Sequence, residues 1–279
     1  MWRTCQAALV LSLAGAVAGA GAVFAAPAAV PWMEISSRLL AGAAAMAVAN
    51  FLTLTVLGGW RAAARFLVLA LLIGWLAEMT GIRCGWLFGG VYHYHPDVQP
   101  VLPGGVPVYI PLAWFVVCGL PVMLLRDGPS GGGRSLLNIA AGAGIAVACD
   151  LALDPVSVAT GIWAWERPGP YFGVPLGNFA GWWLVAGLIL LAGGARGGFR
   201  RPAPIRFDLA WGAANGMLLL VLGRVAWQRP GRFLPVGLAL LGLLPFLWTW
   251  HADLWRKIHV WRMFRLPAGA AASGAAPGT

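Results

Sequence analysis

The chain has 279 residues, of which 60% are apolar and only 10% are charged, with nineteen basic side chains against nine acidic ones. Soluble domains average about 25% charged residues, so this composition excludes both a water-soluble globular domain and a disordered chain. The apolar runs are long enough to cross a bilayer, and we therefore expect an all-α integral membrane protein. The net charge of +10 does not indicate nucleic-acid binding, because the basic residues lie in short connections between apolar runs. In such places they set topology and meet lipid headgroups.

Eight apolar runs predict a single domain, residues 1–266, built as a bundle of about eight transmembrane helices. The first run begins near Ala7 and ends near Val30, and its length favours a retained helix over a cleaved signal peptide. The others are expected at approximately Leu39–Leu57, Phe66–Thr80, Val108–Leu125, Ser135–Leu153, Leu176–Ala192, Leu209–Leu222 and Phe233–Trp250. The Ala/Gly/Pro tail, residues 267–279, is expected to be disordered.

The distribution of basic residues predicts the orientation of this bundle. With the N-terminus in the cytoplasm, thirteen of the nineteen Lys and Arg residues fall on the cytoplasmic side. Cytoplasmic loops carry the excess of positive charge in membrane proteins. We therefore expect both termini to be cytoplasmic, in a bacterial cytoplasmic membrane.

The nine acidic residues fall into two groups. Four lie in connections or at span ends and are expected to be solvated or paired with nearby Arg: Glu34, Asp127, Asp208 and Asp253. The other five collect on the non-cytoplasmic side, in the last turn of the third span, at the end of the fifth span and in the long loops that follow: Glu78, Asp150, Asp154, Asp97 and Glu166.

Asp150 and Asp154 share one helix face because they stand four residues apart. Pro155 is expected to end or bend their helix. Ionisable groups at membrane depth are costly to keep, so the convergence of acids indicates a functional site. The alternative is that these two aspartates pair with Arg167 and Arg83.

The two long loops, from Gly85 to Trp114 and from Asp154 to Trp183, are rich in aromatic residues, Gly and Pro. This composition favours re-entrant or interfacial segments that line an apolar cavity, the alternative being an aromatic belt at the headgroups. His93 and His95 have no third ligand at a diagnostic spacing, so we expect no metal. We favour histidines that, with Glu166, tune a neighbouring acid.

These two loops carry the recognisable motifs of the chain. The first block reads Glu78-x-x-Gly81-x-x-x-Gly85-x-x-Phe88-Gly89-x-x-Tyr92-x-Tyr94, followed by Val106-Pro107 and Trp114. The second reads Asp150-x-x-x-Asp154-Pro155, then Gly161-x-Trp163-x-Trp165 and Tyr171-x-Gly173-Val-Pro175-x-x-Asn178-x-x-Gly181-Trp182. Together they resemble the CruF-type family of membrane carotenoid 1,2-hydratases.

This resemblance implies an enzyme of carotenoid biosynthesis, a hydro-lyase without a redox cofactor. It would add water across the terminal C1=C2 bond of an acyclic end group and leave a tertiary alcohol. The implied substrates are carotenoids of the lycopene, γ-carotene or bisanhydrobacterioruberin type. The implied partners are this lipophilic substrate, water, membrane lipid and other enzymes of the same pathway.

The residues accommodate such chemistry. An alkene is a weak base, so a positioned carboxylic acid must deliver a proton, and we assign Asp154 or Asp150 as donor. Glu78 is assigned as the carboxylate that orients water. Aromatic faces stabilise the resulting cation. The expected binding residues, with an amide that helps to place water, are Tyr92, Tyr94, Trp114, Trp163, Trp165, Tyr171, Trp182 and Asn178.

Three other functions fit parts of this pattern. A proton-initiated carotenoid end-group cyclase needs the same acid but excludes water. A proton-coupled transporter needs a pathway to both faces and commonly has inverted repeats, whereas here the acids lie at one face and no repeat is visible. The third alternative is a non-catalytic pigment-binding or assembly protein.

Overall fold

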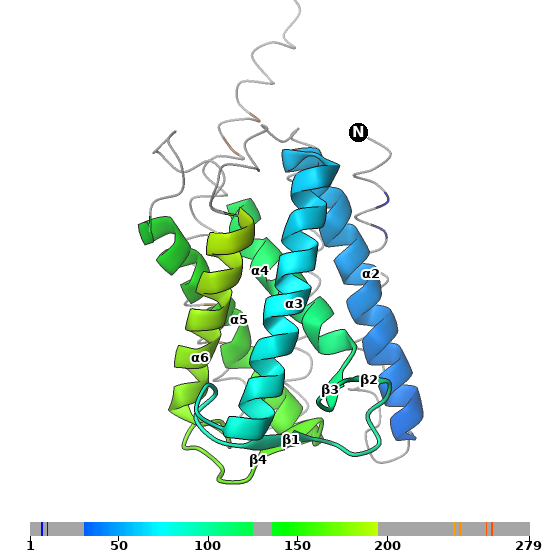
Figure 1. Cartoon of the computed structure of the whole chain (residues 1–279), viewed down its shortest axis with the longest axis vertical. Coiled ribbons are helices and arrows are strands. Elements are labelled where there is room, and N and C mark those ends of the chain that lie inside the picture. The colour runs from blue at the N-terminus through cyan, green and yellow to red at the C-terminus, as the bar shows by residue number, and fades with distance from the viewer. Residues whose placement is uncertain are drawn as a thin grey trace, which may run out of the picture.

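The computed structural model describes residues 31–124 and 136–194, together with a few isolated residues elsewhere. These two stretches form helices that lie side by side in a bundle (Figure 1). In chain order the helices are α2 (Trp32–Gly58), α3 (Trp60–Cys84), α4 (Tyr109–Leu124), α5 (Leu136–Thr160) and α6 (Leu176–Ile189), which continues into the π-helical segment η1 (Leu190–Gly194).

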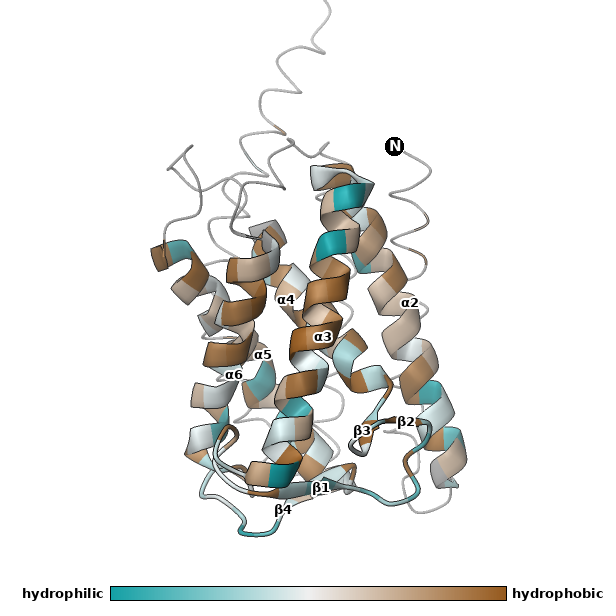
Figure 2. Cartoon of the chain, in the orientation of Figure 1, coloured by the Kyte–Doolittle hydropathy of each residue, from teal (hydrophilic) through white to brown (hydrophobic). Residues whose placement is uncertain are grey.

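Four helices in these stretches are long and apolar enough to cross a membrane, namely Met33–Gly58, Trp60–Cys84, Leu136–Thr160 and Leu176–Gly193. The apolar helix α4 is shorter. Hydrophobic residues run along the helices, and hydrophilic ones gather toward the loops (Figure 2). The second to sixth predicted spans are thus present as helices. The first, seventh and eighth, and the tail, lie outside the described residues, so a total of eight stays a prediction.

Two helix boundaries differ from the expected ones. The third predicted span, Phe66–Thr80, is shorter than the helix α3 that it corresponds to, which runs from Trp60 to Cys84. Only one residue, Gly59, separates α3 from α2. Gly59 has φ 86°, a left-handed conformation that favours glycine and lets the chain reverse. The expectation that α5 ends near Leu153 is also wrong, because Pro155 lies inside a helix that runs on to Thr160.

The two aromatic loops meet at one end of the bundle (Figure 1). Strand β1 (Tyr92–Tyr94) of the first loop pairs antiparallel with β4 (Trp163–Trp165) of the second. Within the first loop, β2 (Val101–Leu102) pairs with β3 (Val106–Pro107) as a short hairpin. The loops therefore form a compact cap over the ends of the helices.

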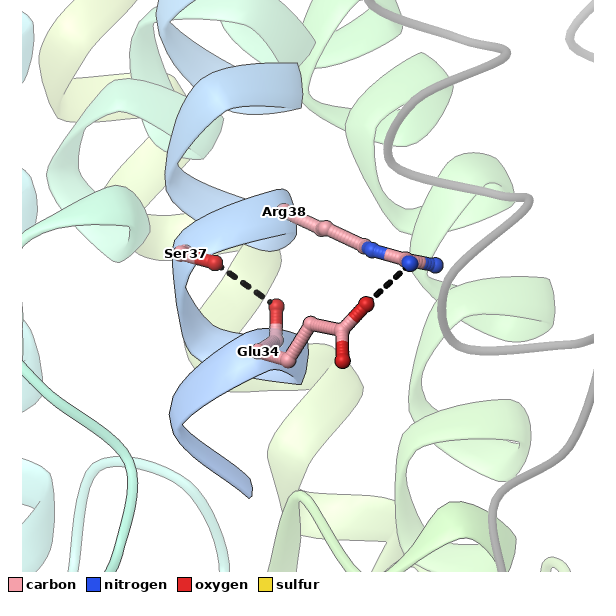
Figure 3. Close-up of polar contacts among 3 residues, drawn as sticks. All are labelled: Glu34, Ser37 and Arg38. Atoms are coloured by element: carbon pink, nitrogen blue, oxygen red, sulfur yellow. Dashed lines mark hydrogen bonds and ion pairs between the residues drawn. The ribbon is translucent and has the colours of Figure 1, made fainter. Parts of the chain in front are cut away.

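The expectation for Glu34 is confirmed. This carboxylate accepts a hydrogen bond from Arg38 one turn later on α2, and both side chains are exposed (Figure 3). The Ser37 hydroxyl donates to the Glu34 carbonyl oxygen over 2.9 Å. The other three acids of this group, Asp127, Asp208 and Asp253, lie outside the described residues.

Candidate active site

Glu78 lies on the buried face of α3, and its neighbours along this face are small residues. Ala70, Gly74, Ala77 and Gly81 are buried on this face together with Glu78, which is only 6% exposed. A side-chain carbon at Gly74 would lie 2.8 Å from the Trp114 indole, and one at Gly81 would lie 2.4 Å from the Phe88 ring. The small residues thus let large aromatic side chains from other elements reach the carboxylate.

The Glu78 carboxylate accepts three side-chain hydrogen bonds. Tyr92 and Tyr94 of β1 both donate their hydroxyls to Oε2, the latter over 2.7 Å. Trp114 of α4 donates its indole N–H to Oε1 over 2.8 Å. Hydrogen bonds to an ionised group are shorter and stronger than those between neutral groups. This donor set therefore suits a charged carboxylate held in one orientation.

The register of the capping sheet explains why the tyrosines reach Glu78. Tyr92 pairs with Trp165 and Tyr94 with Trp163, while His93 pairs with Ala164. Side chains alternate between the two faces of a strand. The four aromatic residues therefore share the face that contains the Glu78 contacts, and His93 belongs to the opposite face.

Burial and the charge on Glu78 together raise the pKa of Tyr92 and of Tyr94 well above the ordinary tyrosine value. Burial is the larger cause in both. Both hydroxyls therefore keep their protons and stay hydrogen-bond donors to Glu78 throughout the physiological pH range.

A second buried carboxyl site is formed by Asp150 and Asp154 of α5, which are 0% and 2% exposed. Asn178, in the first turn of α6, donates its amide to Oδ2 of both, over 2.8 Å and 2.5 Å. The two carboxyl groups lie within hydrogen-bonding reach of each other, and the Trp163 indole lies within hydrogen-bonding reach of Asp154. Glu78 is close enough to act on both aspartates electrostatically.

The alternative in which Arg83 and Arg167 neutralise these aspartates is not what the structure describes. Both arginines are exposed, and no ion pair joins them to Asp150 or Asp154 within residues 31–124 and 136–194. The side chain that donates to both aspartates is instead the amide of Asn178. An amide stabilises the pair without supplying a positive charge.

Pro155 removes one backbone hydrogen bond from this part of α5. Proline has no N–H, so it cannot donate to the carbonyl oxygen four residues earlier, on Leu151. The Tyr171 hydroxyl donates to that oxygen instead, over 2.9 Å. Tyr171, which was predicted to be a substrate-binding residue, thus contacts the backbone between the two aspartates.

The remaining aromatic residues form a continuous cluster around Glu78. Trp114 and Trp182 are stacked with ring centroids 4.0 Å apart, and Phe88 lies 6.5 Å from Trp114. The cluster continues through Tyr92 to Trp165, at 5.5 Å, and through Tyr94 to Trp163, at 5.9 Å. The structure therefore brings together all the predicted aromatic residues except Tyr171, which packs on Phe172 and Phe179.

The predicted tuning residues lie outside the buried cluster. His93 and Glu166 form an ion pair over 2.8 Å, and both side chains are more than half exposed. His95 accepts a hydrogen bond from the Asp97 backbone N–H over 3.3 Å. Of the five acids expected to converge, only Glu78, Asp150 and Asp154 are buried together.

Sequence reasoning assigned no role to two side chains of this region, Phe88, which was only part of a motif, and Tyr109. Phe88 joins Tyr92 to Trp114 in the cluster. Tyr109, the first residue of α4, is buried and close enough to Glu78 to be affected by its charge. One signal was available for Tyr109: the chain has only four tyrosines, and the other three were already candidates.

Comparisons with known proteins identify a family and a related protein. Residues 36–245 match the family described as carotenoid biosynthesis protein. Bisanhydrobacterioruberin hydratase of Haloarcula japonica is 34% identical over 186 residues, which cover 62% of this chain and 58% of that protein. The chain thus matches less than two thirds of the length of this relative. No solved structure matches the chain.

Proposed function

The chain belongs to the family of carotenoid biosynthesis proteins, and from this premise we propose that it is a carotenoid 1,2-hydratase. It adds water to the terminal C1=C2 bond of an acyclic carotenoid end group and gives a tertiary alcohol. The observation that carries the proposal is the presence of two buried carboxyl sites beside a cluster of aromatic rings. Glu78 accepts three side-chain hydrogen bonds, whereas Asp150 and Asp154 share the amide of Asn178.

The aspartate pair is the proton donor. A hydrogen bond between two carboxyl groups requires a proton on one of them, and two charged carboxylates sharing a single buried amide would repel each other. The pair therefore holds one proton in an apolar site. Oδ1 of Asp150 is buried and has no hydrogen-bond partner among the described residues, so a proton that moves from the shared position to this oxygen is available to C2 of the substrate.

The aromatic cluster stabilises the cation. Proton transfer to C2 leaves a tertiary cation at C1, and the faces of Trp and Tyr rings attract such charge. Trp163 links the two parts of the site, since it contacts both Asp154 and the Tyr94 ring. A polyene chain fits the same apolar surface, and the membrane supplies the substrate from the lipid phase.

Glu78 accepts the proton of the attacking water. A carboxylate has about four acceptor positions, and Glu78 receives three hydrogen bonds from described side chains, so one position is open to water. The proton must then return from Glu78 to the aspartate pair. Tyr92 is the side chain that can pass it on, because it donates to Glu78 and is close enough to Asp154 to be affected by its charge.

Expression in a lycopene-producing host tests this function. The expected pigment is heavier than lycopene by one water, as measured by mass spectrometry after chromatography. A cyclised product would instead have the mass of lycopene, and unchanged lycopene would contradict both reactions. In the same host, Asp150→Asn, Asp154→Asn and Glu78→Gln should each abolish most of the hydrated pigment. If all three variants accumulate as much as the unaltered chain, the acid–base roles are wrong.

A further inference from the structure

Tyr109 is a buried tyrosine whose hydroxyl has no hydrogen-bond partner within the described part of the chain. Its side chain is only 6% exposed, at the start of α4. The three other tyrosine hydroxyls each have a partner, on Glu78 or on the Leu151 carbonyl oxygen. Buried polar groups are nearly always hydrogen-bonded, to protein or to water, so an unpartnered hydroxyl is a place where water can bind, and its surroundings decide whether that water can react.

The surroundings of Tyr109 identify the position. Tyr109 belongs to the same buried cluster as Tyr92 and Trp114, two of the donors to Glu78, and it is close enough to Glu78 to be affected by its charge. Oε2 of Glu78 accepts two hydrogen bonds, whereas Oε1 accepts a single one, from Trp114, among the described side chains. An open acceptor on Oε1 and an unpartnered hydroxyl therefore occur in one buried region.

A water molecule matches this pair of groups, because it can donate to a carboxylate while it binds a hydroxyl. Resting on the hydratase activity proposed above, we propose that Tyr109 is the positioning residue for the attacking water. Its hydroxyl holds the water, the water oxygen forms the bond to C1, and the water proton passes to Glu78. Tyr109 takes no part in protonating the alkene, which is the task of the aspartate pair.

Because Tyr109 positions the water and the aspartate pair donates the proton, the two steps can be measured separately. The C1 cation has two fates: it is captured by water, or it loses a proton and becomes an alkene again. In D₂O the proton donor delivers deuterium to C2, so a cation that then loses hydrogen returns as alkene carrying deuterium. Deuterium in the recovered lycopene thus reports cations that lost hydrogen instead of binding water, and the tertiary alcohol reports those that bound water. A cation that loses the added deuterium again gives unlabelled lycopene, so the measurement is the ratio of the two products, compared between proteins.

The test compares the full-length chain with Tyr109→Phe, in membranes supplied with lycopene in D₂O, at early reaction times. Removing one hydrogen bond that positions a reactant changes a rate by about tenfold. We expect hydration to fall by roughly this factor, and the ratio of deuterated lycopene to alcohol to rise correspondingly. The ratio does not depend on how much protein is folded, so a folding defect in the variant leaves it unchanged.

Thr55→Val is the matched control. Thr55 Oγ1 is also buried without a partner among the described residues, but Thr55 lies near the C-terminal end of α2. It should leave both quantities unchanged. An unaltered ratio in Tyr109→Phe would overturn the positioning role, while the unaltered chain would still hydrate lycopene. If the unaltered chain forms no alcohol, the proposed function itself fails, and this inference fails with it.

Discussion

The hydroxyl of Tyr171 donates a hydrogen bond to the carbonyl oxygen of Leu151 over 2.9 Å. Leu151 lies four residues before Pro155, and this carbonyl is the one whose helical donor the proline removes. Asp150 and Asp154 flank the same stretch of α5. The Tyr171 side chain, from the second loop, thus replaces a backbone donor in the turn of α5 that contains both aspartates. The position of the second loop therefore affects the geometry of the aspartate pair.

Replacing the proline should make this contact dispensable. Tyr171→Phe alone is expected to destabilise the protein by about 1 kcal/mol, the usual contribution of one hydrogen bond. In Pro155→Ala the new N–H can bond to Leu151, so adding Tyr171→Phe should cost clearly less. A double-mutant cycle of melting temperatures in detergent measures this coupling. Equal costs in the two backgrounds would show that the tyrosine does not substitute for the missing donor.

The sequence predicted five converging acids, of which three are buried together, and it singled out Asn178. These three acids could be found because polar groups are rare and costly in apolar spans, so each one stands out. It did not predict the pairing of β1 with β4, since three-residue strands in loops rich in Gly and Pro carry no periodic pattern. Without that pairing, His93 could not be separated from Tyr92 and Tyr94. The donor role of Trp114 was also hidden, because sequence does not show which acceptor an indole reaches.

Asn178→Ala should remove most of the activity. It deletes the amide that donates to both Asp150 and Asp154, so the two carboxyl groups lose the geometry in which they share a proton. General acid catalysis contributes about 10²–10⁴-fold to a rate, and we expect a loss of roughly 10²-fold. Asn50→Ala is the matched control, because Asn50 is likewise a buried amide but donates to the Phe115 carbonyl oxygen.

Both alanine variants should lower the melting temperature, since each leaves buried acceptors without a donor. Only Asn178→Ala should lower the activity per folded molecule. A similar loss of specific activity in Asn50→Ala would mean that any buried amide of the bundle matters equally, and that the contact with the aspartates has no special role.

Trp114→Phe tests the donor set of Glu78. The variant keeps an aromatic ring beside Trp182 but loses the indole N–H that donates to Oε1. A hydrogen bond to a charged group contributes about 1.5–3 kcal/mol, so hydration should fall by about ten- to a hundredfold. Trp183→Phe loses an N–H that donates to the Ala140 carbonyl oxygen on a half-exposed side chain. Its hydration rate should stay within twofold; a comparable loss would show that the Glu78 contact is not the cause.

His93→Ala and Tyr94→Phe separate the two faces of β1. His93 forms an exposed ion pair with Glu166, and such pairs are worth about 0–1 kcal/mol, so its removal should leave activity nearly unchanged. Tyr94→Phe removes a donor to Glu78 and should lower the hydration rate by about tenfold. The measurement is the amount of hydrated pigment formed by the two variants, assayed side by side. A drop in His93→Ala as large as that in Tyr94→Phe would restore the tuning role that the sequence suggested.

Alkaline pH should weaken the contact between Tyr171 and Leu151. Burial, followed by the charge on Asp150, raises the pKa of Tyr171 to about 12, whereas an unfolded tyrosine ionises near pH 10. Because the folded state holds this proton more tightly, its contribution to stability is complete below about pH 10 and is lost as the pH rises toward 12. Melting curves in detergent between pH 9 and 12 should therefore fall more steeply for the unaltered chain than for Tyr171→Phe. Tyr92 and Tyr94 are present in both proteins, so their own ionisation cancels in the comparison. Parallel curves across this range would mean that Tyr171 ionises equally easily in the folded and unfolded chains, and that its hydroxyl is not held by the helix.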